Sequence, residues 1–346
     1  MTAEDSLRAF GVHDGDITTL AGMTIAFIGY GNQGRAQALN LRDSLDRANI
    51  ECPIIAATLP DETRERARED GFDVSSASDA ARAADILFLL IPDEEQPPVF
   101  RAEIAPALTA GKALVFASGY NLTYGEIEPP EGVDVLLLAP RMIGRQLRQL
   151  YERDQGFYSY LSVEQDGSGQ AWPLLLALAQ GIGTLAAGGG AFEFSARNET
   201  ILDLYHEQGF GSLFGTMFML MLDVGLKAGI PAEALVLDLY LSGEAMQTLQ
   251  AMVDVGFYEQ SKLHSRTSQY GGMMRTIELD NEPIRKHLEK VVEEVKSGAF
   301  YERWTAERDA GYEMFEKLRE LAGKANPFTP LEERIRAAFR EAHERD

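Results

Sequence analysis

The sequence predicts an α/β protein in which a doubly wound parallel sheet is followed by a mainly α-helical domain. Three observations support this fold class. Short, continuously apolar runs alternate with polar helical stretches in the first half, a glycine-rich turn follows the first run, and strand-like runs almost disappear beyond about Gly169. Continuous apolar runs separated by helices are typical of strands buried on both faces of a parallel sheet.

Five runs in the first half have the length and composition of buried strands. They are residues 24–28, 53–58, 85–91, 113–117 and 133–139. The polar stretches 35–47 and 64–69 have helical character and supply crossovers between parallel strands. We expect a first domain at residues 1–165, with the weakest connection between residues 152 and 169.

The second half, residues 166–346, has apolar residues at helical spacing. The expected helices are 171–180, 201–226, 232–253 after Pro231, 282–296, 311–322 and 330–343. The most apolar stretch, 213–222, is about half the length that spans a bilayer and is expected to be a buried helix.

Charge and cysteine content exclude several classes of function. The chain has 32 basic and 54 acidic residues, a net charge of −22, which disfavours nucleic acid and anionic membrane surfaces as partners. Cys52 is the only cysteine, so an intrachain disulfide and a multi-cysteine zinc site are excluded. The acidic N-terminus lacks the features of a signal peptide, so we expect a cytoplasmic protein.

The glycine-rich turn follows the run at 24–28 and leads into a helix. Its residues are Gly29, Tyr30, Gly31, Asn32, Gln33 and Gly34. In the G-x-G-x-x-G pattern the first glycine permits the tight turn, the second admits a pyrophosphate and the third lets the helix pack on the strand. The helix N-terminus then offers N–H groups to the phosphates. The pattern predicts a dinucleotide site; a purely structural turn is the alternative.

Three charged residues after the second run bear on the choice of nucleotide. An acidic side chain here, at Asp61 or Glu62, would bind the ribose 2′-hydroxyl and repel a 2′-phosphate, which favours NAD(H) over NADP(H). Arg64 would instead hold a 2′-phosphate. The third interpretation is that all three form a solvated helix start, where acids are favoured.

Collinear segments over nearly the whole chain resemble the ketol-acid reductoisomerase family. They are residues 29–44, 89–94, 125–140, 166–171, 203–208, 265–271 and 297–304. The resemblance, to the short form with one helical domain, implies a Rossmann domain, a knotted helical domain and a homodimer with composite active sites. It also implies magnesium-dependent alkyl migration on a small hydroxy or keto acid, followed by reduction with NADPH. It adds nucleotide contacts at Ile91, Pro92, Asp93, Gln96 and Gly119.

The resemblance also implies carboxylate ligands for magnesium. Asp203 and Glu207 match two of them and, four residues apart, would share one helix face. Glu244 matches another, but Tyr240 stands where the remaining acid is expected. We therefore expect one bound magnesium ion rather than two. The alternative for the three acids is a set of solvated helix faces.

Further departures lie at the expected chemical centre. Ser118 stands where the family has histidine, and Arg141 where it has lysine, whereas Ser265 matches a substrate-binding serine. Arginine stays charged and acts as an electrostatic clamp, so Arg141 would bind a substrate carboxylate or form a surface salt bridge.

Tyrosines gather in the same segments, at 120, 205, 240 and 270. With carboxylates they would hold a cationic group by cation–π attraction, with Tyr120 and Tyr240 as substrate contacts; ordinary packing is the alternative. A remodelled branch of the family builds a cyclopropanol from a sulfonium dihydroxy acid, and this pattern would suit such a reaction in specialised metabolism. The other readings are an authentic reductoisomerase of branched-chain amino acid synthesis and an inactive nucleotide-binding homologue.

Overall fold

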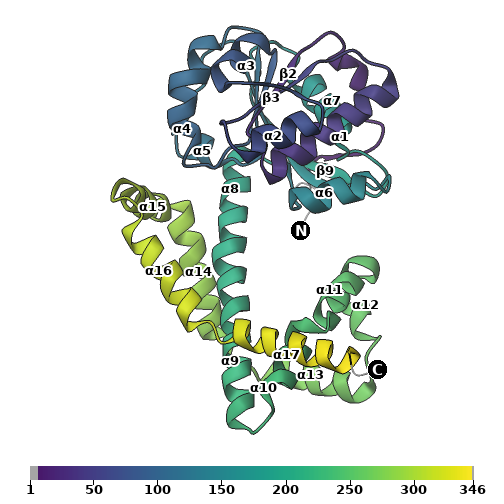
Figure 1. The fold of residues 1–346 in the computed structure, drawn as a ribbon, viewed down its shortest axis with the longest axis vertical. Helices are drawn as coiled ribbons and strands as arrows, with labels where there is room; N and C mark the ends of the chain where they lie inside the picture. Colours follow the sequence, from purple (N-terminus) through teal and green to yellow (C-terminus); the bar gives the residue numbers. More distant parts are fainter. Residues whose placement is uncertain (1–6, 345–346) are drawn as a thin grey trace. The chain divides into compact units, whose positions relative to one another are not determined.

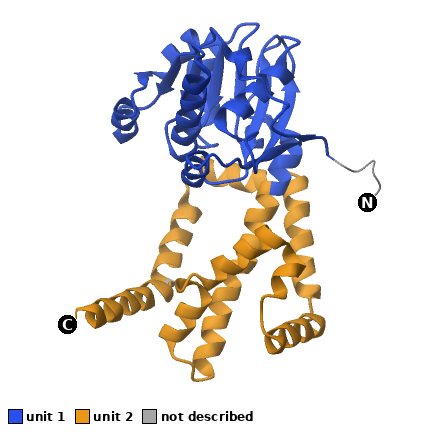
Figure 2. Ribbon diagram, turned by 90° about the vertical axis from the view of Figure 1, so that its right-hand side faces the viewer, with its two compact units in different colours: residues 1–202 blue, residues 203–346 orange. Residues whose placement is uncertain are grey.

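The computed structural model describes residues 7–344, which fold as two compact units (Figure 2). The first unit ends at Leu202 and the second begins at Asp203. This boundary lies after the expected one at residues 165/166. The reason is that helix α7 (Ala171–Ile182) packs against the sheet, and the strand that follows it joins the sheet.

The first unit contains a nine-stranded sheet, and its parallel part runs in the order β4-β3-β2-β5-β6-β7. These strands are β2 (Ile25–Ile28), β3 (Ile54–Ala57), β4 (Asp73–Ser75), β5 (Ile86–Leu89), β6 (Ala113–Phe116) and β7 (Asp134–Pro140). All five predicted runs form strands, and the doubly wound sheet is confirmed. The strand order reverses between β2 and β5, where such sheets bind ligands.

Three more strands extend the sheet beyond β7, and the sequence analysis missed them. β8 (Tyr158–Gln165) runs antiparallel to β7, β9 (Gly190–Glu193) runs parallel to β8, and β1 (Ala9–Phe10) pairs with β9. Residues 158–165 of the expected connection at 152–169 therefore form a strand. Its apolar residues alternate with polar ones, which is a weaker signal than a continuous apolar run.

Helices cover both faces of this sheet and enclose two apolar layers (Figure 1). The first layer is buried by α1 (Asn32–Ala48), α6 (Gly144–Tyr151) and α7. Phe27 and Phe88 stack in it, with ring centroids 4.5 Å apart. The second layer is buried by α3 (Ala77–Ala83) and by α4 (Gln96–Val99) with the π-helix η3 (Phe100–Ile104).

The second unit is helical. Helix α8 (Ala196–Tyr205) continues without a break through the π-helix η5 (His206–Phe210) into α9 (Gly211–Lys227). The helices that follow are α10 (Ala232–Val236), α11 (Glu244–Val255), α12 (Phe257–Ser261), α13 (Arg266–Glu278), α14 (Glu282–Lys296), α15 (Ala299–Asp309), α16 (Glu313–Ala325) and α17 (Phe328–His343). The expected helix 232–253 is interrupted by the π-helix η6 (Leu237–Leu241) and by Gly243, whose φ is +84°.

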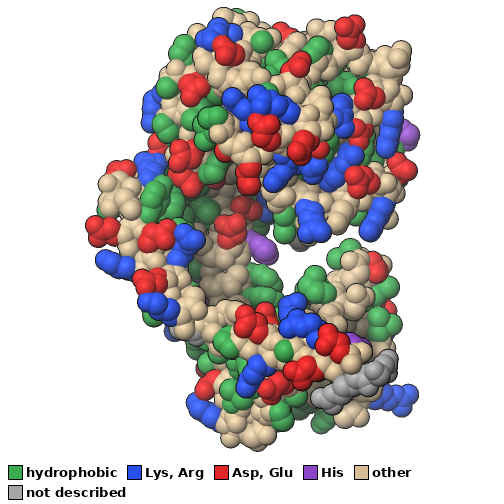
Figure 3. Space-filling model, in the orientation of Figure 1, with side chains coloured by type: hydrophobic (Ala, Val, Ile, Leu, Met, Phe, Trp, Pro, Cys, Tyr) green, Lys and Arg blue, Asp and Glu red, His purple; other side chains and the backbone are tan. Residues whose placement is uncertain are grey.

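Much apolar surface of the second unit is uncovered within the single chain (Figure 3). Helix α9 exposes Phe214, Met217, Leu220 and Met221, so the expectation that 213–222 is buried is wrong for the isolated chain. Ala196–Lys227 is the one helix in the described part of the chain that is long and apolar enough to cross a membrane. The core helix of a soluble protein passes the same test of length and composition.

Candidate functional site

A cavity of about 650 Å³ opens at the carboxyl ends of β2, β3 and β5, where the strand order reverses. Among the expected nucleotide contacts it is lined by Gly29, Tyr30, Gly31, Asp61, Arg64, Ile91 and Pro92. Apolar walls with a few polar groups at a switch point are typical of a nucleotide site.

The three glycines of the turn have different surroundings. Gly29 has φ +104°, and a Cβ there would lie 2.8 Å from Ile91. A Cβ on Gly34 would lie 2.0 Å from the carbonyl oxygen of Gly29, so only glycine lets α1 approach β2 so closely. A Cβ on Gly31 would meet nothing within 4 Å, which leaves open space where a phosphate would approach. The turn therefore fits a dinucleotide.

The other residues of the turn use their side chains to hold the surrounding structure. Asn32 Oδ1 accepts from the N–H of Arg145, and Gln33 Nε2 donates to the carbonyl of Met142. Tyr30 is buried and donates to Asp70, and burial, followed by this bond, raises the pKa of its hydroxyl. These bonds hold the turn against the loop after β7 and against Asp70.

The loop after β3 and the start of α2 (Glu62–Glu69) bring an acid, Asp61, and a base, Arg64, to the wall of the cavity. Asp61 caps α2, since its Oδ1 accepts from the N–H of Thr63 at 2.9 Å and from the Thr63 hydroxyl at 2.6 Å. These bonds lower the pKa of the Asp61 carboxyl. Arg64 turns back to the sheet, where Nη2 donates to the carbonyl of Thr58 at 2.8 Å. Glu62 is exposed in the first turn of α2.

The loops after β5 and β6 are tied together by amide groups. Asn121 Nδ2 donates to the Asp93 carbonyl and to Gln96 Oε1, both at 2.9 Å. Gln96 is buried, and its Nε2 donates to the carbonyl of Ile91. Asp93 and Gln96 therefore shape the rim of the cavity without lining it.

A buried ion pair lies beside the loop after β6. Glu199 of α8, with a side chain 1% exposed, accepts from Arg141 Nη1 at 3.0 Å and from the N–H of Gly119 at 2.9 Å. Ser118 Oγ accepts from the N–H of Tyr120 in the same loop. Arg141 therefore forms a salt bridge within the chain, in which Glu199 is buried and Arg141 is partly buried. Glu199 was missed because a single acid in a helix gives no sequence signal.

Asp203 and Glu207 lie where the second unit begins, as the helix passes from α form into η5. π segments are rare and are frequent at functional sites. Two carboxylates with waters and substrate oxygens are a common environment for magnesium, so this pair fits the ion chemically. Within residues 7–344 no three His, Cys, Asp or Glu side chains gather as a metal site, so Glu244 does not join the pair in one chain.

The remaining expected residues of the second unit have structural contacts. Tyr240 stacks on Phe218 and donates to Glu332 of α17; burial and then this bond raise its pKa to about 12. It is partly buried against a small core that contains Leu222, as the packing interpretation expects; its contact with a substrate stays a prediction. Ser265 caps α13 by accepting from the N–H of Ser268.

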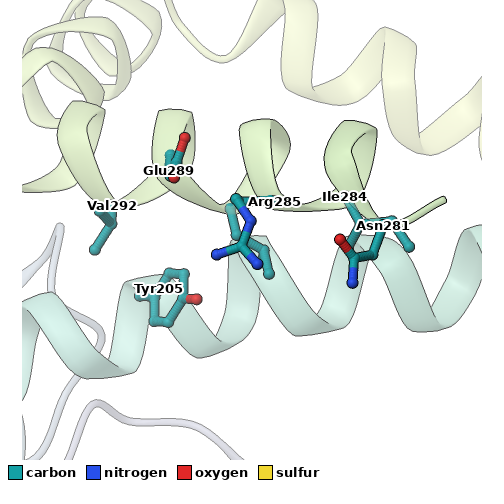
Figure 4. Close-up of a pocket in the computed structure, with 7 residues that line it drawn as sticks. Tyr205, Asn281, Ile284, Arg285, Glu289 and Val292 are labelled. Atoms are coloured by element: carbon teal, nitrogen blue, oxygen red, sulfur yellow. The ribbon is translucent and has the colours of Figure 1, made fainter. Parts of the chain in front are cut away.

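A shallow groove of about 460 Å³ separates α14 from the helix that carries Tyr205 (Figure 4). Tyr205 rises from that helix towards α14, and Arg285 points from α14 back across the groove. Tyr205 is partly buried in this groove, whereas the Arg285 side chain remains largely exposed.

Comparisons with known proteins agree with this layout. The NADPH-binding domain of acetohydroxy acid isomeroreductase matches residues 19–188, and the ketol-acid reductoisomerase C-terminal domain matches residues 196–341. The NADP⁺ ketol-acid reductoisomerase of Methanopyrus kandleri is 37% identical over 90% of this chain and 93% of its own length. That of Methanocaldococcus jannaschii is 36% identical over 89% and 92%.

A solved structure supports the same assignment. The NADH-preferring ketol-acid reductoisomerase from an uncultured archean has a TM-score of 0.86 and 29% identity, covering 97% of this chain and 99% of that one. Its likeness extends through both units. The chain therefore belongs to the ketol-acid reductoisomerase family of NAD(P)-dependent oxidoreductases.

Proposed function

We propose that this protein is a ketol-acid reductoisomerase that acts on a small hydroxy-keto acid in the cytoplasm, with NAD(H) and one magnesium ion. The observation that carries the proposal is the match of the family through both units, together with the intact glycine turn and the Asp203–Glu207 pair. When bound, the nicotinamide would supply hydride and magnesium would polarise substrate oxygens.

The preference for NAD(H) rests on the loop after β3. Asp61 and Arg64 both line the cavity, but the Arg64 guanidinium already donates to the Thr58 carbonyl, whereas the Asp61 carboxylate adds a negative charge at the start of α2. Repulsion between one carboxylate and a 2′-phosphate is on the order of 1–4 kcal/mol at partial exposure. Tighter binding of NADPH than of NADH in calorimetry would contradict this preference.

The active site is proposed to be composite, built in a homodimer. Helices α9, α11 and α13 carry apolar residues that are exposed in the single chain and would be buried in a subunit interface. Among the most exposed are Met246, Val253, Tyr270 and Ile277. A second copy would cover them and bring Glu244 and Ser265 to the Asp203–Glu207 pair of the other subunit. We expect an interface well above about 2,000 Å². A monomeric mass by light scattering at micromolar concentration would contradict it.

A second candidate is a changed reaction of the same centre, including cyclopropanol formation from a sulfonium dihydroxy acid. It is favoured by the side chains at three positions. Ser118 and Arg141 replace a histidine and a lysine, and Tyr240 points into a packed core instead of supplying a carboxylate. None of the three can move a proton near neutral pH as histidine does.

One experiment separates these candidates. The purified protein and magnesium are incubated in separate reactions with acetolactate and NADH or NADPH, and with a sulfonium dihydroxy acid and NAD⁺ or NADP⁺, and products are followed by mass spectrometry. Turnover that is lost in Asp203→Asn, with NADH affinity retained, supports the reductoisomerase. Absence of turnover with acetolactate but conversion of a sulfonium dihydroxy acid supports the second candidate. Tight NADH binding with no conversion of any such acid would identify an inactive homologue.

A further inference from the structure

The helix that carries Asp203 and Glu207 has a back face occupied by α14. Tyr205 lines the groove against α14, Gly209 is buried under it, and Ser212 bonds to it. Residues two apart on a helix point about 200° from one another. Asp203 and Glu207 each lie two residues from Tyr205, so both carboxylates project from the face opposite to α14.

Two residues of α14 hold the helix on either side of the irregular turn. A Cβ on Gly209 would lie 3.0 Å from Leu288 Cδ2, so the absence of a side chain there lets α14 approach η5 closely. Beyond the turn, Ser212 Oγ lies 2.9 Å from His287 Nε2 and donates to the Gly209 carbonyl at 3.1 Å. A hydroxyl has one hydrogen, so when Ser212 donates to the Gly209 carbonyl, the Nε2–H tautomer of His287 donates to Ser212.

These contacts matter because a π turn changes the rotation of everything that follows it. The N–H of Gly211 donates to the carbonyl of His206, five residues back, in place of the usual four. Glu207 is the second residue of this π segment and Asp203 lies in the α-helical part before it, so the shape of the segment bears on where the two carboxylates lie relative to each other. A less regular turn needs support from tertiary contacts, and α14 supplies two, with Leu288 close to Gly209 and His287 bonded to Ser212.

We propose that His287 and Leu288 are positioning residues, which lock the π turn and thereby set the spacing of Asp203 and Glu207 for a divalent cation. The inference rests on the proposed function, because it takes these two carboxylates as the magnesium ligands. Groups that orient metal ligands typically contribute 10–100-fold to metal affinity. The effect of this pair should fall at the lower end, since Ser212 is exposed.

The test is calorimetric titration of MgCl₂ into the full-length protein and its variants. His287→Ala and Ser212→Ala should each weaken magnesium binding about tenfold. His287→Gln keeps an N–H donor and should recover most of the loss, which a merely structural role of the imidazole would not explain. Lys290→Ala, on the exposed face of the same helix, is the matched control and should bind as the unchanged protein does.

Two further measurements separate failure of this inference from failure of the proposed function. Glu207→Gln must abolish tight binding; if it does not, the proposed metal site is wrong. If Glu207→Gln abolishes binding while both His287→Ala and Ser212→Ala leave it unchanged, the positioning role is wrong. Amide hydrogen exchange across residues 206–212 should be faster in His287→Ala, and slower again in His287→Gln. Faster exchange with unchanged magnesium affinity would also overturn the inference.

Discussion

Removing the charge of Glu199 is the most informative perturbation of the first unit. In Glu199→Gln one oxygen acceptor becomes an NH₂ donor, facing either the N–H of Gly119 or the Arg141 guanidinium. Breaking a buried ion pair from one side costs about 3–5 kcal/mol. The Arg141 side chain is 27% exposed, so water compensates part of the lost interaction. We therefore expect Glu199→Gln to lower the free energy of unfolding by about 3 kcal/mol.

The assay uses tryptophan fluorescence during thermal unfolding. The chain has two tryptophans, and a Trp304→Phe background leaves Trp172, which packs against Phe10 in the first unit. A loss of about 3 kcal/mol should lower the midpoint by about 6–12 °C in a unit of this size. Adding Arg141→Met should recover much of the loss, because both charges are then gone. If the double variant is no more stable than Glu199→Gln, the ion-pair reasoning is refuted.

Three other perturbations have defined outcomes. Gly31→Ala should weaken NADH binding at least about tenfold without changing the unfolding temperature. Gly34→Ala should lower both the affinity for NADH and the unfolding temperature, because its Cβ would lie 2.0 Å from a backbone oxygen. Calorimetry measures the affinities, and thermal unfolding measures the temperatures. Burial alone would raise the pKa of Asp70, but bonds from an arginine and a tyrosine lower it overall. The stabilisation of the fold by the Asp70 carboxylate is thus complete above its unfolded-state pKa of about 4 and is lost as pH falls through its lower folded-state pKa. In Asp70→Asn, the free energy of unfolding should therefore decrease less steeply as the pH is lowered into this range. Tyr240→Phe should cost about 1–2 kcal/mol in urea unfolding by removing the bond to Glu332, and Tyr240→Glu should cost more because it puts two carboxylates together.

The parallel sheet could be predicted because its strands are apolar on both faces. Residues 86–89 and 113–116, for example, are buried throughout, and such runs are visible in sequence without any partner. β8 was missed because its sequence, Tyr-Ser-Tyr-Leu-Ser-Val, alternates and begins after a loop. β1 and β4 have two and three residues, which is too short for any period to be read.

The site was predictable where backbone geometry dictates residue type, as at Gly29 and Gly34. The contacts of the site residues were not predictable where a side chain has several possible partners that lie far apart in the sequence. Arg141 was expected to bind a substrate carboxylate or to form a salt bridge, and the sequence does not reveal its partner within the chain, Glu199, which lies 58 residues later. Tyr240 was expected at a ligand position, but the π turn around it directs the ring into the core of the second unit.

The pairing of β1 with β9 has a consequence for synthesis on the ribosome. Phe10 is buried, and its strand partner Ala191 emerges about 180 residues later. At roughly 5–20 residues per second, the nascent chain must carry an unpaired N-terminal strand for about 10–40 s. The pairing of β1 with β9 at the sheet edge therefore forms only after β2, β3 and β5, which surround the nucleotide cavity, have all been synthesised. The growing chain is most open to mispairing or chaperone capture at its own N-terminus, rather than at the turn on which catalysis depends.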